Sequence, residues 1–168
     1  MIDITDSDAG PSQSRSIRER EALIGALAAL PDELQRTLQG HSPESLTRPA
    51  SDGGWGVVEN LCHLRDWEEV FLERAHAIVE QERPLLAAYD DELWSIERDY
   101  RGQDPTRTLG QFRELRTRLM ALLTGLDQAA WSRIGQHASF GEISLHWLAN
   151  HICDHGEEHL QQIRDALG

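Results

Sequence analysis

The sequence contains no lysine, so all 16 of its basic residues are arginines. Schiff-base formation and general-base catalysis by a lysine are therefore excluded. Cysteine is scarce as well, because the chain has only Cys62 and Cys153 and no CxxC pair. Two cysteines are too few for the disulfide framework of a small secreted domain. We therefore expect two reduced, half-buried thiols in a cytoplasmic protein.

Positive charge is also in short supply. The 16 basic and 29 acidic residues give a formal net charge of −13 at pH 7, which repels nucleic-acid phosphates and anionic membrane surfaces. No apolar run approaches the roughly 20 residues that cross a membrane. The polar, acidic N-terminus lacks the basic start and the apolar run of a secretion signal. These absences predict a cytoplasmic protein without nucleic-acid or membrane partners.

The chain is rich in the apolar spacing of amphipathic helices. Apolar residues recur every three or four positions over four stretches, at about residues 16–39, 56–81, 104–126 and 142–166. No segment alternates between apolar and polar residues, so strands are not expected. The chain length of 168 residues is enough for one buried core. We predict an all-α four-helix bundle domain over residues 16–168, preceded by a disordered tail over residues 1–15.

Proline and glycine mark the interruptions in this pattern. Pro31 lacks an N–H, so the first helix is expected to kink or restart there. Residues 40–54 and 127–141 are expected to be loops. The crossover over residues 84–104 is long enough to pass across the end of the bundle, and it is predicted to contain a short extra helix around Asp90–Tyr100.

The last predicted helix carries three histidines spaced four residues apart, namely His151, His155 and His159. Residues four apart share one helical face, so two neighbouring imidazoles can hold one metal ion. His159 lies at the centre of the apolar stripe, His155 lies beside it and His151 lies at its margin. Burying imidazoles without partners is costly, and metal ligation removes that cost. The glutamate of a zincin HExxH motif is absent, because Gly156 follows His155.

A lone histidine, His63, lies inside the apolar pattern of the second helix. Bundles build metal sites from side chains on facing helices, so we predict His63, His155 and His159 as the metal ligands. Three neutral imidazoles suit Zn, Ni or Fe and leave one position open for water or substrate. The competing hypothesis is a structural homodimer whose histidines are merely packed, because such histidine pairs also occur without a metal.

Weaker candidates surround these histidines. Four polar residues are candidates for contacts to the ligands or for the mouth of the site: Glu59, Asp66, Arg74 and His137. Four tryptophans are candidates for lining a pocket: Trp55, Trp67, Trp131 and Trp147. An ordinary surface position is the default for each polar residue, and core packing is the default for each tryptophan.

Two longer patterns contain the three predicted ligands. They are Trp55-x-x-x-Glu59-x-x-x-His63-Leu64-x-Asp66-Trp67-Glu68, and Gly141-Glu142-x-Ser144-Leu145 followed by His151-x-x-x-His155-x-x-x-His159-Leu160-x-Gln162-Ile163. Together they resemble the second-helix and fourth-helix signatures of the DinB superfamily, which includes the YfiT-like proteins. The resemblance covers nearly all of residues 16–167. The sequence departs from it at Gly56, where Ser or Thr is common and would cap the helix better.

The resemblance implies a four-helix bundle, often dimeric, in which one histidine of helix two and an HxxxH pair of helix four hold a divalent metal. By position these are His63, His155 and His159. His151 fills a position where many members also have histidine, so the pair His151/His155 stays an alternative.

Characterised members of the family include thiol S-transferases that use low-molecular-weight thiols, and a mycothiol-dependent maleylpyruvate isomerase. The resemblance therefore implies a metal-dependent enzyme that acts on a small molecule, either a thiol-dependent S-transferase or a hydrolase. In such enzymes the metal would lower the pKa of a bound thiol. The alternative is a non-catalytic stress protein that binds a metal or a small ligand in the same cavity.

Overall fold

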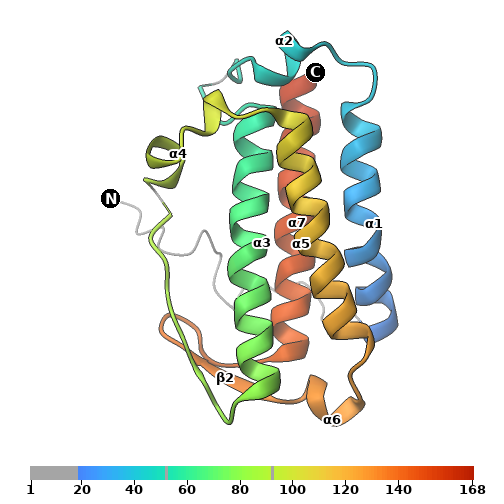
Figure 1. Cartoon of the computed structure of the whole chain (residues 1–168), viewed down its shortest axis with the longest axis vertical. Coiled ribbons are helices and arrows are strands. Elements are labelled where there is room, and N and C mark those ends of the chain that lie inside the picture. The colour runs from blue at the N-terminus through green and yellow to red at the C-terminus, as the bar shows by residue number, and fades with distance from the viewer. Residues whose placement is uncertain (1–18, 52, 92) are drawn as a thin grey trace.

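The computed structural model describes residues 19–51, 53–91 and 93–168 (Figure 1). The predicted disordered tail over residues 1–15 lies outside these residues. Four long helices dominate the fold, as predicted: α1 (Arg20–Leu38), α3 (Val57–Glu80), α5 (Pro105–Thr124) and α7 (Leu145–Leu167). The prediction of a four-helix bundle is confirmed.

The four helices form a ring in the order α1, α5, α3, α7. Each of α1 and α3 packs against both α5 and α7, so helices that follow one another in the chain lie diagonally across the bundle or are joined by a long connection. In Figure 1, α3 and α5 run in the same direction, and α1 and α7 run in the opposite one. Because α3 and α5 are parallel neighbours, the chain between them must return along the whole length of the bundle. The crossover does this along the outer side of α3.

This crossover contains two short helical segments, α4 (Trp94–Glu97) and the 3₁₀ turn η1 (Tyr100–Gly102). They lie where the sequence predicts a short extra helix. Two further short helices lie in segments that were expected to be loops, namely α2 (Pro43–Thr47) and α6 (Gln128–Trp131). Each of these has a side-chain cap, because Ser42 and Asp127 accept backbone N–H groups of the first turn.

The expectation that the chain has no strands is wrong. A small sheet closes one end of the bundle with β1 (Leu85–Leu86), β2 (Ile134–His137) and β3 (Gly141–Ser144). The strand order is β1-β2-β3, with β1 parallel and β3 antiparallel to β2. Strands of two to four residues are too short to show the alternation that identifies a strand in a sequence.

Helix α1 continues through Pro31 as one element, so a restart at this proline is not observed. The proline leaves the carbonyl of Leu27 without its helical N–H partner. Arg116 of α5 fills this role, because its Nη1 donates to the Leu27 oxygen at 2.7 Å. The same guanidinium forms a buried ion pair with Glu68 of α3, with Nη2 2.8 Å from Oε2. One arginine therefore satisfies the proline gap and joins three helices.

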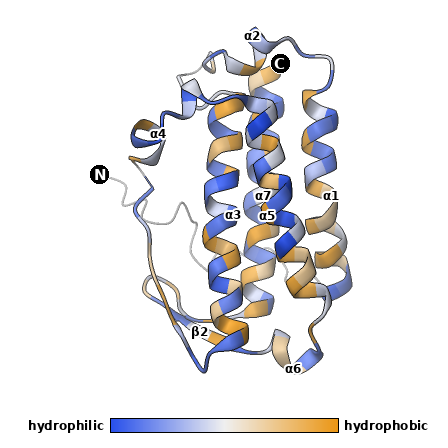
Figure 2. Cartoon of the chain, in the orientation of Figure 1, coloured by the Kyte–Doolittle hydropathy of each residue, from blue (hydrophilic) through white to orange (hydrophobic). Residues whose placement is uncertain are grey.

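Apolar residues of all four long helices fill the interior, and Figure 2 shows hydrophobic and hydrophilic residues alternating along each of these helices. On α7, Cys153 belongs to one buried apolar cluster and Leu160 to the other. His155 and His159 lie between these two residues. Within the part of the chain that the structure describes, no helix has the length and apolar content needed to span a bilayer.

Candidate metal centre

The structure brings the three predicted ligands together from two helices. His63 of α3 and His155 and His159 of α7 are all buried, with exposed fractions of 1%, 8% and 6%. One ring nitrogen of each residue can be chosen so that the three nitrogens lie within 4.8 Å of one another. The Nε2 atoms of His63 and His155 are 3.2 Å apart.

These distances fit a metal ion. Two nitrogens bound to one tetrahedral zinc ion at about 2.0–2.1 Å are roughly 3.3 Å apart, which is close to the 3.2 Å between His63 and His155. Direct packing of two imidazoles at this distance allows one N–H···N hydrogen bond at most. A third ring, His159, has its centroid 4.6 Å from the centroids of both others. Each neutral imidazole has one lone pair, so three converging rings can direct three lone pairs at one cation.

Burial keeps the three imidazoles neutral. Desolvation lowers the pKa of His63 and of His155 well below the ordinary value of 6.5, and the neighbouring His159 lowers both further. Desolvation also lowers the pKa of His159, to about 4. At neutral pH each ring therefore keeps one lone pair, which is the form that binds a metal.

A buried asparagine orients His159. The Oδ1 atom of Asn60 lies 2.7 Å from Nδ1 of His159, so the amide oxygen accepts the ring N–H and the lone pair of the ring is on Nε2. The Nδ2 atom of Asn60 donates to the carbonyls of Gly56 and Trp55, at 2.9 and 3.2 Å. Asn60 was not among the residues predicted for the site. Its signal in the sequence was only a polar residue three positions before His63 in an apolar pattern.

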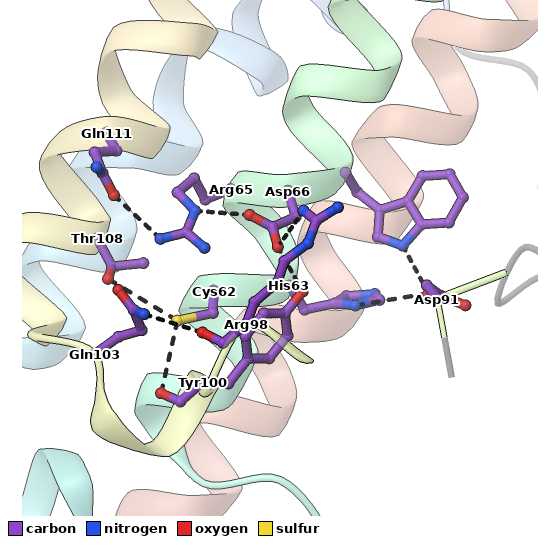
Figure 3. Close-up of polar contacts among 11 residues, drawn as sticks. Cys62, His63, Arg65, Asp66, Asp91, Arg98, Tyr100, Gln103, Thr108 and Gln111 are labelled. Atoms are coloured by element: carbon purple, nitrogen blue, oxygen red, sulfur yellow. Dashed lines mark hydrogen bonds and ion pairs between the residues drawn. The ribbon is translucent and has the colours of Figure 1, made fainter. Parts of the chain in front are cut away.

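On the other side of the cluster, the crossover places Asp91 near His63. Its Oδ2 atom accepts the indole N–H of Trp67 at 2.8 Å and lies 3.8 Å from Nδ1 of His63 (Figure 3). Asp91 is buried, with an exposed fraction of 5%. This residue was also missed in the sequence, because its proximity to α3 depends on the path of the crossover.

His151 lies outside the cluster that the three nitrogens form among the described residues. Its ring stacks on Trp147 with centroids 5.0 Å apart and planes inclined by 7°. It also contacts Phe71 edge-on, at 5.7 Å. The geometry thus supports the set His63, His155 and His159 over the alternative pair His151/His155.

Glu59, a candidate for a contact to the ligands, instead caps α3. Its carboxylate accepts the N–H of Gly56 at 2.9 Å and pairs with Arg101 of the crossover at 2.9 Å. Gly56 has no side chain, so only the glutamate half of a capping box is present. A Cβ at position 56 would lie 2.4 Å from the carbonyl oxygen of Arg48. Close approach of two backbone segments therefore explains the glycine where the family commonly has Ser or Thr.

Asp66 and Arg74 hold the crossover against α3. The Asp66 carboxylate accepts the hydroxyl of Tyr100 at 2.7 Å and pairs with Arg98 at 2.8 Å (Figure 3). Arg74 donates to the carbonyl of Ala87 at 2.8 Å. Neither residue belongs to the histidine cluster. Their contacts position the segment that carries Asp91.

The remaining candidates divide between the site and the core. The indole of Trp55 lies 4.7 Å from the ring of His63, and that of Trp67 lies 6.3 Å from it, so both line the cluster. Trp131 is buried in the apolar core. His137 lies in β2, where its Nδ1 accepts the backbone N–H of Ser139 in the turn before β3.

Neither of two cavities in the described part of the chain is lined by the three histidines themselves. One, of about 280 Å³, is lined by Trp55 and by residues of the preceding loop and of α7: Ala50, Ser51, Gly54, Gln162, Asp165 and Ala166. Trp55 contacts both this cavity and the histidines. A larger cavity of about 340 Å³ is lined by residues that include Leu27 and Cys153 but not Trp55. We therefore associate the smaller cavity with the candidate metal centre.

The sequence model of the DinB superfamily matches residues 19–163. Among similar proteins, the "Putative metal-dependent hydrolase YfiT" of Bacillus subtilis is 29% identical over 133 residues, covering 79% of this chain and 75% of that protein. A protein of Geobacillus thermodenitrificans, described as a "Putative metal-dependent hydrolase", is 28% identical over 155 residues, covering 91% of this chain and 86% of its own length.

The fold agrees with the sequence comparison. The solved structure of YfiT from Bacillus subtilis, described as having an unusual four-helix bundle topology, superposes with a TM-score of 0.83 at 26% sequence identity. The match covers 95% of this chain and 91% of that one. With a family model that spans nearly the whole described chain and a matching bundle, this chain belongs to the DinB superfamily.

Proposed function

We propose that this chain is a metal-dependent hydrolase in which His63, His155 and His159 hold one divalent ion, namely Zn, Ni or Fe. The observation that carries the proposal is the convergence of three buried, neutral imidazoles with their nitrogens within 4.8 Å. The description of the relatives as metal-dependent hydrolases supports the same reaction class. Three protein ligands leave a fourth position of a tetrahedral ion for a reactant.

When bound, the ion supplies a Lewis acid that lowers the pKa of a water or thiol nucleophile. Residues of this chain orient the histidines and shield them from water. Asn60 fixes the tautomer of His159, and the indoles of Trp55 and Trp67 pack beside His63 and keep bulk water from that ring. The cavity of about 280 Å³ beside Trp55 is close to the lower end of the size range of small-molecule sites.

The two cysteines are unsuited to act as the nucleophile. We expected half-buried thiols, but Cys62 and Cys153 are both buried, with exposed fractions of 0% and 4%. Burial raises the pKa of the Cys62 thiol to about 11, which keeps it protonated at neutral pH. Cys153 lines the larger cavity, away from the histidines. A thiol-dependent S-transferase reaction at this site therefore requires an external low-molecular-weight thiol.

The position of Gly156 bears on the catalytic base. In a zincin this position carries the glutamate base, but here a Cβ would lie 2.4 Å from Cδ2 of Leu30 on α1. A side chain at position 156 would therefore require the side chain of Leu30 to move. The glutamates that follow, Glu157 and Glu158, are exposed. We propose that a base, where the reaction needs one, is supplied by the reactants.

Metal analysis tests the proposal most directly. We expect the purified protein to contain about one equivalent of a divalent metal, measured by inductively coupled plasma mass spectrometry, and the His155→Ala variant to have lost most of it. Absence of stoichiometric metal from the wild-type protein, with no change in the variant, would instead support a homodimer with packed histidines. Light scattering on the same sample measures whether the predicted homodimer forms.

A substrate screen then separates the reaction classes. A hydrolase turns over esters or amides without added thiol. A thiol S-transferase requires mycothiol, bacillithiol or glutathione together with an electrophile. His63→Ala is the control in both assays, since it removes one ligand while leaving α7 unchanged. Metal binding without turnover above this control in either assay favours a non-catalytic protein that binds a metal or a small ligand.

A further inference from the structure

The ring of His63 has a polar atom that the cluster does not use. Its Nε2 atom points at His155, while Nδ1 lies on the opposite edge of the ring. Among the described residues, no donor or acceptor lies within hydrogen-bond distance of this buried Nδ1 atom. A buried polar group without a partner is costly, so such a group in a folded protein calls for an explanation.

The nearest charged group on that edge is the carboxylate of Asp91. Its Oδ2 atom is 3.8 Å from Nδ1 of His63, about 1 Å longer than a hydrogen bond. The same oxygen accepts the indole N–H of Trp67 at 2.8 Å, which fixes the carboxylate beside the ring (Figure 3). Asp91 does not belong to the set of converging ligand atoms. It therefore faces the back of the ligand rather than the metal position.

We propose that Asp91 is a positioning residue for His63, whose carboxylate accepts the Nδ1–H of the ring once a metal occupies Nε2. This inference rests on the metal site proposed above. In a neutral imidazole whose Nε2 lone pair binds an ion, the proton lies on Nδ1, which becomes a donor in need of an acceptor. The hydrogen bond fixes the tautomer and the ring orientation and makes the ligand more basic.

His159 and His63 would then each donate a ring N–H to a buried side chain beside the cluster. On one face the amide of Asn60, within α3, holds His159 at 2.7 Å. On the other face the crossover supplies Asp91 to His63. The crossover is anchored to α3 by the bonds of Tyr100 and Arg98 to Asp66. The long connection between α3 and α5 thus places the carboxylate of Asp91 beside His63, a predicted ligand on α3.

Asp91→Asn tests this proposal, with Asp32→Asn as the matched control. The substituted amide has the same shape as the carboxylate and still accepts the indole N–H of Trp67, but it is a poorer acceptor for His63. We expect the affinity for Zn²⁺, measured by competition with a chromophoric chelator, to fall roughly 10–100-fold. The control removes the same charge from an exposed carboxylate of α1 that pairs with Arg113 of α5, away from the crossover and the ligands. It should leave Zn²⁺ affinity within about twofold of the wild type.

Spectroscopy of the wild-type protein gives a second measurement that requires no variant of Asp91. Long-range ¹H–¹⁵N spectra of the Zn²⁺-loaded protein should show His63 protonated at Nδ1, with its proton shifted downfield by the carboxylate, and metal-bound at Nε2. The visible spectrum of the Co²⁺-loaded protein should change in Asp91→Asn and not in Asp32→Asn.

The outcomes separate the two proposals. Equal Zn²⁺ affinity in Asp91→Asn and wild type, or equal losses in both variants, overturns the role of Asp91 while the metal site stands. Binding of Zn²⁺ through Nδ1 of His63 overturns it as well. A wild-type protein that binds no Zn²⁺ overturns the proposed function and, with it, this inference.

Discussion

At the scale of single residues, two glycines differ in the space that is available for a side chain. Gly56 caps α3 where a Cβ would lie 2.4 Å from a backbone oxygen of Arg48. Gly110 lies on the exposed face of α5 with no atom within 4 Å of the place where a Cβ would stand. The first glycine is required by close backbone approach, whereas the second only adds conformational freedom to the unfolded chain.

These two positions give the first prediction. Gly56→Ala should lower the free energy of unfolding by about 1–3 kcal/mol, because backbone atoms must move to admit the methyl group. Gly110→Ala should raise it by roughly 0.5–1 kcal/mol through helix propensity. Urea denaturation of both variants measures the difference. A Gly56→Ala protein as stable as the wild type would contradict the tight contact with the loop before α3.

Cys62 gives a prediction about alkaline pH. Its pKa in the folded protein, about 11, lies above the value of 9.0 for a free thiol, so the folded state holds its proton more tightly than the unfolded state. The contribution of this thiol to the free energy of unfolding is therefore fully present below pH 9 and is lost as pH rises toward 11, by at most about 1.4 kcal/mol per pH unit. Urea denaturation at several pH values, compared with Cys62→Ala, isolates this slope. If the free energies of unfolding of the wild type and of Cys62→Ala changed with pH in parallel, the raised pKa of Cys62 would be contradicted.

At the scale of elements, Arg116 connects three helices through charges that are fully buried. It pairs with Glu68 of α3, whose exposed fraction is 2%, and donates to Leu27 of α1 beside Pro31. Arg113, one turn earlier on α5, also contacts α1 through Asp32, but this pair is exposed. The two arginines thus offer the same chemistry on the same helix with and without burial.

We predict that Arg116→Met lowers the free energy of unfolding by about 3–5 kcal/mol, because it leaves Glu68 charged and buried. Arg113→Met should change it by less than about 1 kcal/mol, since exposed ion pairs contribute little. Adding Glu68→Leu to Arg116→Met should recover much of the loss. Chemical denaturation of the three proteins measures these effects. A double variant no more stable than Arg116→Met would show that the carbonyl of Leu27, rather than the charge, dominates.

The sequence predicted the elements that carry long periodic signals and missed those that depend on contacts. The four long helices followed from apolar spacing sustained over many turns, and the convergence of His155 and His159 followed from helical periodicity. Strand β2 was missed because a strand this short shows no clear alternation of apolar and polar residues. Its pairing with β1, which lies far away in the sequence, and with β3 is visible only in the structure.

The supports of the candidate site were missed for the same reason. Asn60 contacts a histidine 99 positions away in the chain, and Asp91 approaches His63 only because the crossover returns along α3. Of the residues predicted to touch the ligands or the mouth, Glu59 and Asp66 instead anchor that crossover. Polar residues in an apolar pattern signal a buried network, but the sequence does not say which network.

At the scale of the whole molecule, the site is a consequence of topology. The parallel arrangement of α3 and α5 forces a connection as long as the bundle, which runs along α3. That connection places Asp91 3.8 Å from Nδ1 of His63. The ring order places α3 beside α7, although the two helices are separated in sequence by α5. An ion held by His63, His155 and His159 would therefore join two distant segments of the chain.

This arrangement predicts that metal removal destabilises the whole bundle. The unfolded chain lacks the preformed site, so an ion at about a hundredfold excess over its dissociation constant stabilises the folded state by about 2.7 kcal/mol. For a chain of this length that corresponds to a loss of roughly 5–10 °C in melting temperature on chelation. His155→Ala should melt at the same temperature with and without chelator. A wild-type melting temperature that chelator leaves unchanged would mean that packing alone holds α3 against α7, and that the three histidines are part of that packing rather than the ligands of an ion.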